Sequence, residues 1–127
     1  MGVELSSAPL APVVVALGDP VLDILARVSP AWLATVVPEP GGCLPILPGA
    51  MEQLLEDAGK QSELVRIPGG SAANVIKGVA NIGGGGVVCR FVGMIGRDET
   101  GAEYRRKLAE QVYVGAKEQG RYGAIHA

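Results

Sequence analysis

The sequence predicts an α/β protein with a parallel sheet between two helical layers, and three observations lead to this class. Short apolar runs alternate along the chain with segments of helical period, which is the order typical of parallel sheets. The 127 residues are 48% apolar, which is enough for one domain with a real core. The 19 glycines and 9 prolines mark the turns between these segments.

The first predicted elements are two strands and a short helix. Residues 13–17 form a continuous apolar run that ends at Gly18, which is typical of a strand buried on both faces of a sheet. Residues 24–28 form a second apolar segment, and Arg27 within it predicts a more exposed strand. Pro30 suits the first position of a helix, and it predicts one or two helical turns over 30–33.

A loop separates this region from the next predicted helix. Residues 38–49 hold four prolines and three glycines, so we expect loop or edge structure there. Residues 50–58 place their apolar side chains on one helical face, and Gly59 is expected to end that helix as a C-terminal glycine. Residues 64–67 predict a strand that leads to a glycine pair.

The remaining segments continue the alternation of helix and strand. Residues 72–82 predict a central helix with a broad apolar stripe, and residues 87–92 predict another buried strand. Thr100 and Glu103 have the spacing of a capping box, which predicts a helix that continues through Gln111. This order of elements favours the parallel, three-layer arrangement.

Charge and composition exclude several classes of function. The net charge of −2, the pI of about 5.4 and the aromatic content of 4% argue against a surface for nucleic acid or anionic membranes. No apolar run reaches the roughly 18 residues of a membrane span, and the amino terminus lacks the basic region of a secretory signal. We therefore expect a cytoplasmic protein with no membrane partner, in which Cys43 and Cys89 are reduced and Cys89 faces a core.

The most informative candidate site is the step from Gly69-Gly70 into the helix predicted at 72–82. Two adjacent glycines let a ligand approach the backbone, and the first turn of a helix has N–H groups without acceptors. Asn74 adds a side-chain donor and acceptor to that turn. This set suits a neutral, hydroxyl-bearing molecule better than a metal ion. The alternative is an ordinary strand-to-helix turn with Ser71 as its N-cap.

Two aspartates lie near the carboxyl end of the first strand, where ligands bind in open α/β sheets. A carboxylate at either Asp19 or Asp23 is suited to accept two O–H groups of a sugar. The alternative for Asp19 is turn chemistry beside Pro20. Asp23 lies within apolar sequence, where an unpaired carboxylate is costly, and both a binding role and a structural role stay open for it.

Common nucleotide-binding and hydrolase motifs are absent from the sequence. Lys60 is followed by Gln61, and Leu54 stands where a P-loop needs its first glycine. The glycines at 83–86 follow a helix and precede a strand, which is the reverse of a dinucleotide-binding turn. The single histidine, His126, is next to the end of the chain, so no Ser–His–acid set can be assembled. We assign no catalytic residue and no metal ligand.

Three segments that occur in series carry a family resemblance. They are Gly18-Asp19-Pro20-Val21-Leu22-Asp23-Ile24, Gly69-Gly70-Ser71-Ala72-Ala73-Asn74 and Phe91-Val92-Gly93-Met94-Ile95-Gly96-Arg97-Asp98-Glu99-Thr100-Gly101. Together, over residues 13–111, they resemble the amino-terminal half of the PfkB, or ribokinase-like, carbohydrate kinase family, which includes adenosine kinase.

The resemblance implies a three-layer, Rossmann-like ribokinase fold with a small β lid, in which the diglycine lies at the hinge between lid and core. The second and third predicted strands would belong to the lid. Asp23 and Asn74 would bind hydroxyls of a sugar or nucleoside, with Gly69 and Gly70 as close backbone contacts. Members of the family transfer the γ-phosphate of ATP to such a hydroxyl, so ATP and Mg²⁺ are the implied cofactors.

The sequence departs from the family pattern after residue 111. The family's second signature, a Gly-Ala-Gly-Asp sequence with the catalytic base, and the ATP-binding loops around it have no counterpart here. We assign residues 1–111 to the amino-terminal part of the kinase domain and residues 112–127 to a divergent, inert tail. We therefore expect a truncated product or fragment that carries the substrate-binding half without the catalytic base and the ATP site.

Two other interpretations stay open. A non-catalytic binding or regulatory protein would keep the hydroxyl-binding pocket and would associate with another copy or a relative through the lid or an open sheet edge. An unstable fragment would expose apolar edges and faces and would aggregate. Within the family, the sequence favours an adenosine-kinase-like or a plant and algal sugar-kinase-like branch, and it does not distinguish a sugar from a nucleoside.

Overall fold

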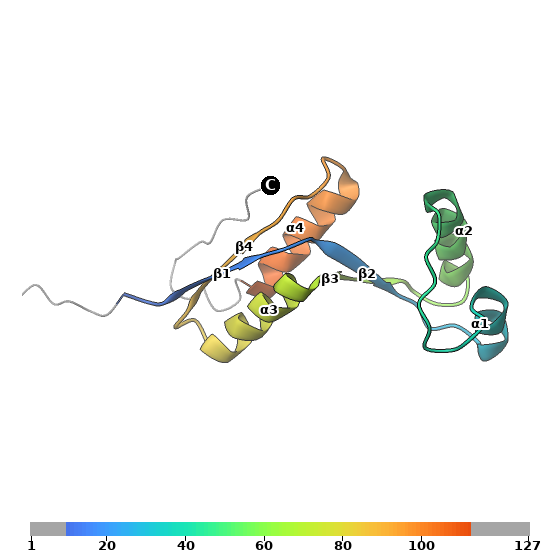
Figure 1. The fold of residues 1–127 in the computed structure, drawn as a ribbon, viewed down its shortest axis with the longest axis horizontal. Coiled ribbons are helices and arrows are strands. Elements are labelled where there is room, and N and C mark those ends of the chain that lie inside the picture. The colour runs from blue at the N-terminus through green and yellow to red at the C-terminus, as the bar shows by residue number, and fades with distance from the viewer. Residues whose placement is uncertain (1–9, 113–127) are drawn as a thin grey trace, which may run out of the picture. The chain divides into compact units, whose positions relative to one another are not determined.

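The computed structural model describes residues 10–112, which divide into two compact units (Figure 1). The sheet unit comprises residues 10–22 and 68–112, and the insert unit comprises residues 23–67. The sheet unit contains the diglycine, and the insert unit contains Asp23.

The described residues form four strands and four helices. In chain order they are β1 (Val13–Leu17), β2 (Val21–Leu25), α1 (Pro30–Val36), α2 (Pro48–Gly59), β3 (Val65–Gly69), α3 (Ser71–Gly83), β4 (Val88–Val92) and α4 (Glu99–Val112). This order confirms the predicted α/β class. The second strand begins earlier than predicted, because half-buried Leu22 and Ile24 alternate with exposed Asp23 and extend the strand pattern back to Val21.

β1 and β4 lie side by side as a parallel pair, which confirms the predicted parallel arrangement. In this pair Val13 is opposite Val88 and Leu17 is opposite Val92. The N–H of Gly18 continues the ladder by donating to the carbonyl of Val92 at 3.1 Å. β2 and β3 form a second two-stranded sheet. The three-layer arrangement and the β lid stay predictions, because the described residues form only these two pairs.

The core of the sheet unit lies between the β1–β4 pair and the two helices α3 and α4 (Figure 1). Cys89 and Phe91 are buried on the strand side, and their side chains alternate with exposed Arg90. The helices contribute Ile76 and Leu108, which are fully buried. Burial raises the pKa of the Cys89 thiol, and it confirms the predicted position of this residue in a core.

The opposite face of the β1–β4 pair is uncovered within residues 10–112. Val13, Val15 and Leu17 are exposed, Leu17 by 77%, whereas Val14 and Ala16 pack against the core. The continuous apolar sequence of this strand predicts burial on both faces. Within the described residues the strand is covered on one face only. Both packed helices lie on one side, and an apolar run does not specify which element covers its second face.

The start of α4 differs from the predicted capping box. The helix is capped by Asp98, whose Oδ1 accepts the N–H of Gly101 at 2.8 Å, and not by Thr100. Glu103 instead forms an ion pair with Lys107 at 3.3 Å, one turn further along the helix. A capping box needs Glu or Gln three residues after the cap, but Gly101 is at that position after Asp98 and Glu103 is five residues after it, so the box does not form.

The insert unit holds α1 and α2 and the segments that join them to the strands. The side chain of Ser29 caps α1, as expected for a helix with proline in its first turn. α2 ends at Gly59, but this glycine does not have the positive φ of a C-terminal glycine cap, so that prediction is wrong. The side chains of Ser62 and Gln61 accept the backbone N–H groups of Arg27 and Ser29, each at 2.9 Å, which ties the turn after α2 to the segment before α1.

The predicted tail at 112–127 lies outside the described residues, apart from Val112, which is buried at the end of α4. His126 lies outside them as well. Among residues 10–112, no helix is both long and apolar enough to cross a membrane.

Candidate functional site

The diglycine forms a sharp turn between β3 and α3. β3 ends at Gly69, and Gly70 occupies the N-cap position with φ 96° and ψ 144°. Ser71 is the first helical residue, and no side chain forms a capping hydrogen bond at this end. The alternative in which Ser71 caps the helix is therefore wrong, because the chain turns one residue earlier than a serine cap requires.

Two physical constraints require glycine at position 70. Its positive φ is a conformation that other residues adopt only with strain. A Cβ at this position would also lie 2.5 Å from the backbone carbonyl oxygen of Asp19. The segment after β1 therefore packs directly against the turn. A Cβ at Gly18 would likewise lie 2.7 Å from the Cβ of Ala72. The close packing of these two segments therefore requires a glycine in each of them, Gly18 after β1 and Gly70 in the turn.

Two side chains from the helices hold the turn by its carbonyl groups. The Lys77 Nζ donates to the carbonyl oxygen of Pro68 at 2.6 Å. The Tyr104 hydroxyl donates to the carbonyl oxygen of Gly69 at 3.0 Å, in a buried hydrogen bond between residues 35 apart in the chain. Sequence reasoning did not identify either residue as part of the site. Only the packing of α4 against α3 brings Tyr104 to the turn.

The first turn of α3 presents polar groups with unused hydrogen-bonding capacity. The N–H of Asn74 donates to the carbonyl of Gly70 at 2.9 Å and closes the first helical hydrogen bond. The N–H groups before it have no acceptor within the helix, and no side chain caps them. The side chain of Asn74 is exposed. The turn therefore offers backbone donors together with a neutral side chain that both donates and accepts.

Asp23 lies at the centre of β2 in the insert unit, whereas Gly69, Gly70 and Asn74 belong to the sheet unit. Its carboxylate is exposed and forms no hydrogen bond or ion pair with another described residue. The structure brings Gly69, Gly70 and Asn74 together in one turn. The inclusion of Asp23 in the same site stays a prediction.

A second glycine turn precedes α4. The carboxylate of Asp98 caps the helix through the N–H of Gly101 and packs against Gly96, where a Cβ would lie 3.0 Å from both of its oxygens. Gly101 is buried, and a Cβ on it would overlap the carbonyl oxygen of Gly96. The spacing of Gly96, Asp98 and Gly101 is thus explained by a closely packed turn in which Asp98 caps the helix.

The cofactors implied by the resemblance have no evident site among the described residues. No group of three or more His, Cys, Asp or Glu side chains in residues 10–112 could hold a metal ion. We therefore assign no described residue to Mg²⁺ or ATP.

Comparison with known proteins gives a distant likeness to a kinase. No protein-family profile matches the chain, and no curated protein matches it. Among solved structures, the chain is similar to the apo form of adenosine kinase from Trypanosoma brucei brucei, with a TM-score of 0.59, 25% sequence identity and coverage of 83% of this chain. The chain spans 32% of the length of that structure. This likeness supports, at a coarse level, the relationship to ribokinase-like kinases that the sequence motifs indicate.

Proposed function

We propose that this chain is the acceptor-binding, amino-terminal part of a kinase that phosphorylates a hydroxyl group of a sugar or nucleoside. The observation that carries the proposal is the diglycine turn, whose uncapped helix start and exposed Asn74 offer hydrogen bonds to a neutral, hydroxyl-bearing molecule. The likeness to an adenosine kinase structure supports the same class of acceptor.

In this proposal the residues of the turn bind and orient the acceptor. Gly69 and Gly70 let a hydroxyl group approach the backbone, because neither residue has a Cβ to exclude it. Asn74 donates to one hydroxyl oxygen and accepts from another O–H, and the Asp23 carboxylate accepts two more O–H groups. Tyr104 and Lys77 keep the turn in place without touching the ligand. ATP would supply the phosphoryl group when bound.

Calorimetric titration of the 127-residue chain with adenosine, ribose and fructose tests this proposal. We expect one of them to bind, and we expect Asn74→Ala to weaken binding by about tenfold or more, because a buried ligand hydroxyl loses its partner. Asn81→Ala is the matched control, since Asn81 is also exposed on α3 but lies near its far end. Asp23→Ala should weaken binding to a similar degree.

The outcomes separate the alternatives. Binding that does not depend on Asn74 or Asp23 would overturn the assignment of the site, and no binding of any of the three compounds would overturn the proposed function. Saturable binding without phosphoryl transfer from ATP, by the chain as it exists, would favour a non-catalytic sugar- or nucleoside-binding protein.

A further inference from the structure

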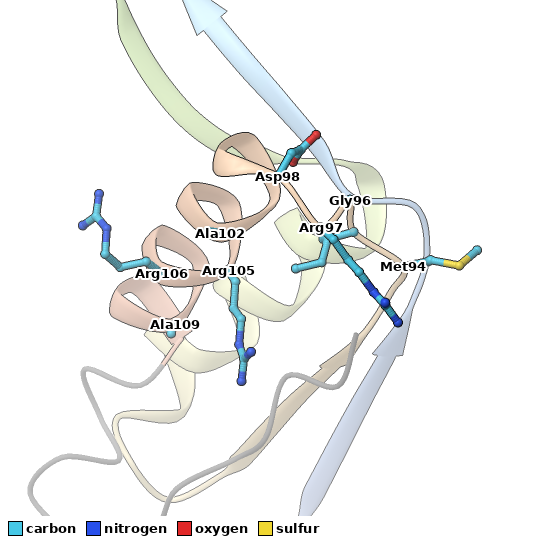
Figure 2. Close-up of a pocket in the computed structure, with 9 residues that line it drawn as sticks. Met94, Gly96, Arg97, Asp98, Ala102, Arg105, Arg106 and Ala109 are labelled. Carbon is cyan, nitrogen blue, oxygen red and sulfur yellow. The ribbon is translucent and has the colours of Figure 1, made fainter.

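A cavity in the sheet unit lies beyond the carboxyl end of β4, between the loop that follows this strand and one side of α4 (Figure 2). Its volume is about 710 Å³, which is within the range of small-molecule sites. The α4 side is formed by residues spaced three and four apart, at positions 102, 105, 106 and 109. None of the residues of the diglycine turn lines this cavity.

The walls of the cavity are basic, although the chain as a whole is acidic with a net charge of −2. Arg97, Arg105 and Arg106 line it, and Asp98 is the one acidic residue among its described lining residues. Arg106 is neutralised by Glu110 on the next turn, at 2.7 Å. The side chains of Arg97 and Arg105 form no ion pair with any residue in 10–112.

The single carboxylate in the walls does not neutralise these two arginines. Asp98 accepts the N–H of Gly101 at 2.8 Å as the cap of α4. Figure 2 shows its carboxylate directed away from Arg97 and Arg105, whose side chains extend to the other side of the loop and helix. Arg97 and Arg105 therefore line one cavity without a counter-charge from the described chain.

We propose that this cavity binds a phosphate group, either as inorganic phosphate or as the phosphate ester of a small molecule. A phosphate carries nearly two negative charges at neutral pH and three acceptor oxygens, which matches two planar guanidinium groups. The cavity lies where ligands bind in parallel α/β sheets, outside the carboxyl end of a strand. The lining also includes the apolar residues Met94, Ala102 and Ala109, which would contact the organic part of an ester.

This inference does not depend on the proposed function. The acceptor turn offers uncharged groups for hydroxyls, whereas the arginine cavity offers two positive charges and would leave a neutral sugar without matching partners. The two sites should therefore respond to different ligands and to different substitutions.

The test uses the full 127-residue chain, with inorganic phosphate and phenyl phosphate as probes in calorimetry and in amide-resolved NMR titration. We expect saturable binding of at least one probe, with amide shifts in residues 94–109 and none in residues 69–74. Arg97→Gln and Arg105→Gln should each weaken binding about tenfold or more, because each removes a charge-assisted hydrogen bond. The double substitution should abolish binding, and added salt should weaken it.

Arg90→Gln is the matched control, because Arg90 is an exposed arginine of the same unit that does not line the cavity. Phenyl phosphate that binds more tightly than inorganic phosphate would identify an ester ligand, and equal affinities would identify free phosphate. The proposal is overturned if neither probe saturates, if Arg90→Gln weakens binding as much as the other variants, or if an oligoglutamate peptide binds the arginines more tightly than either probe. Circular dichroism of each variant establishes that loss of binding is not loss of folding.

Discussion

Two glycine turns in the sheet unit begin its two helices, and they differ in how the helix start is satisfied. At the start of α4, the carboxylate of Asp98 accepts the N–H of Gly101. Gly96 and Gly101 pack so closely that a Cβ on Gly101 would overlap the carbonyl oxygen of Gly96. At the start of α3, Gly70 has no side chain to offer, and the first N–H groups of the helix have no capping side chain.

The difference shows that glycine has a separate physical role in each turn. Gly101 is required because a neighbouring carbonyl leaves no room for a side chain. Gly70 is required for its positive φ as well as for its contact with the Asp19 carbonyl, and it leaves the donors of α3 uncapped. In a self-capped turn the side chain of the cap occupies a backbone N–H group of the helix start. In an uncapped turn these N–H groups are available to a ligand.

The largest effect is expected at the uncapped turn itself. Gly70→Ala should lower the free energy of unfolding by about 2–5 kcal/mol, because it adds backbone strain to a steric overlap with the Asp19 carbonyl. Urea unfolding followed by circular dichroism measures the change. Gly84→Ala is the matched control, since Gly84 also has positive φ but has open space around it, and it should cost only about 1 kcal/mol. Equal costs for the two variants would contradict the role of the close contact.

A smaller effect is expected from the hydroxyl that holds the same turn. Tyr104→Phe removes the donor to the buried Gly69 carbonyl and should cost about 1–3 kcal/mol of stability, because the carbonyl is left without that partner. The aromatic ring and its packing against Phe91 are retained in this variant. If binding of an acceptor falls in Tyr104→Phe while Lys107→Ala leaves it unchanged, the hydroxyl positions the turn for the ligand. An unchanged unfolding midpoint would show that the hydrogen bond adds nothing to the native state.

The smallest effect is expected at the self-capped turn. Asp98→Ala should cost about 1 kcal/mol, because α4 loses its N-cap. Asp98→Asn keeps an oxygen acceptor at the cap and should retain most of the stability. The same urea unfolding experiment compares the two. Acceptor binding at the diglycine should be unaffected by either substitution, and a parallel loss of binding would mean that the two turns are not independent.

Most elements of the sheet unit were predictable from short stretches of sequence. The apolar run at 13–17 and the apolar period of the central helix depend on residues that are neighbours in the chain, and both elements lie where predicted to within a residue or two. The errors concerned the helix ends, the start of β2 and the burial of the second face of β1. Thr100 was predicted to cap the helix because its spacing from Glu103 matches a capping box, whereas Asp98 caps it through the N–H of Gly101.

The candidate site was predictable only in part. The diglycine and Asn74 are close in sequence, so their arrangement in one turn follows from the chain itself. The hydrogen bond from Tyr104 was not predictable, since it joins residues 35 apart and depends on how α4 packs. The cavity of Arg97 and Arg105 was missed for a similar reason, because a loop and a helix face form it together.

The α/β order of elements, the position of the diglycine and the three motifs that resemble a kinase family could all be recognised in the sequence. These features depend on the apolar period and on turn residues, and both can be recognised from residues that are neighbours in the chain. The tertiary structure alone decided that Gly70 leaves α3 uncapped, that Tyr104 and Lys77 hold the turn, and that two arginines share one cavity. These features arise from packing between segments distant in the chain, where a side chain's partner depends on the fold and not on its sequence neighbours.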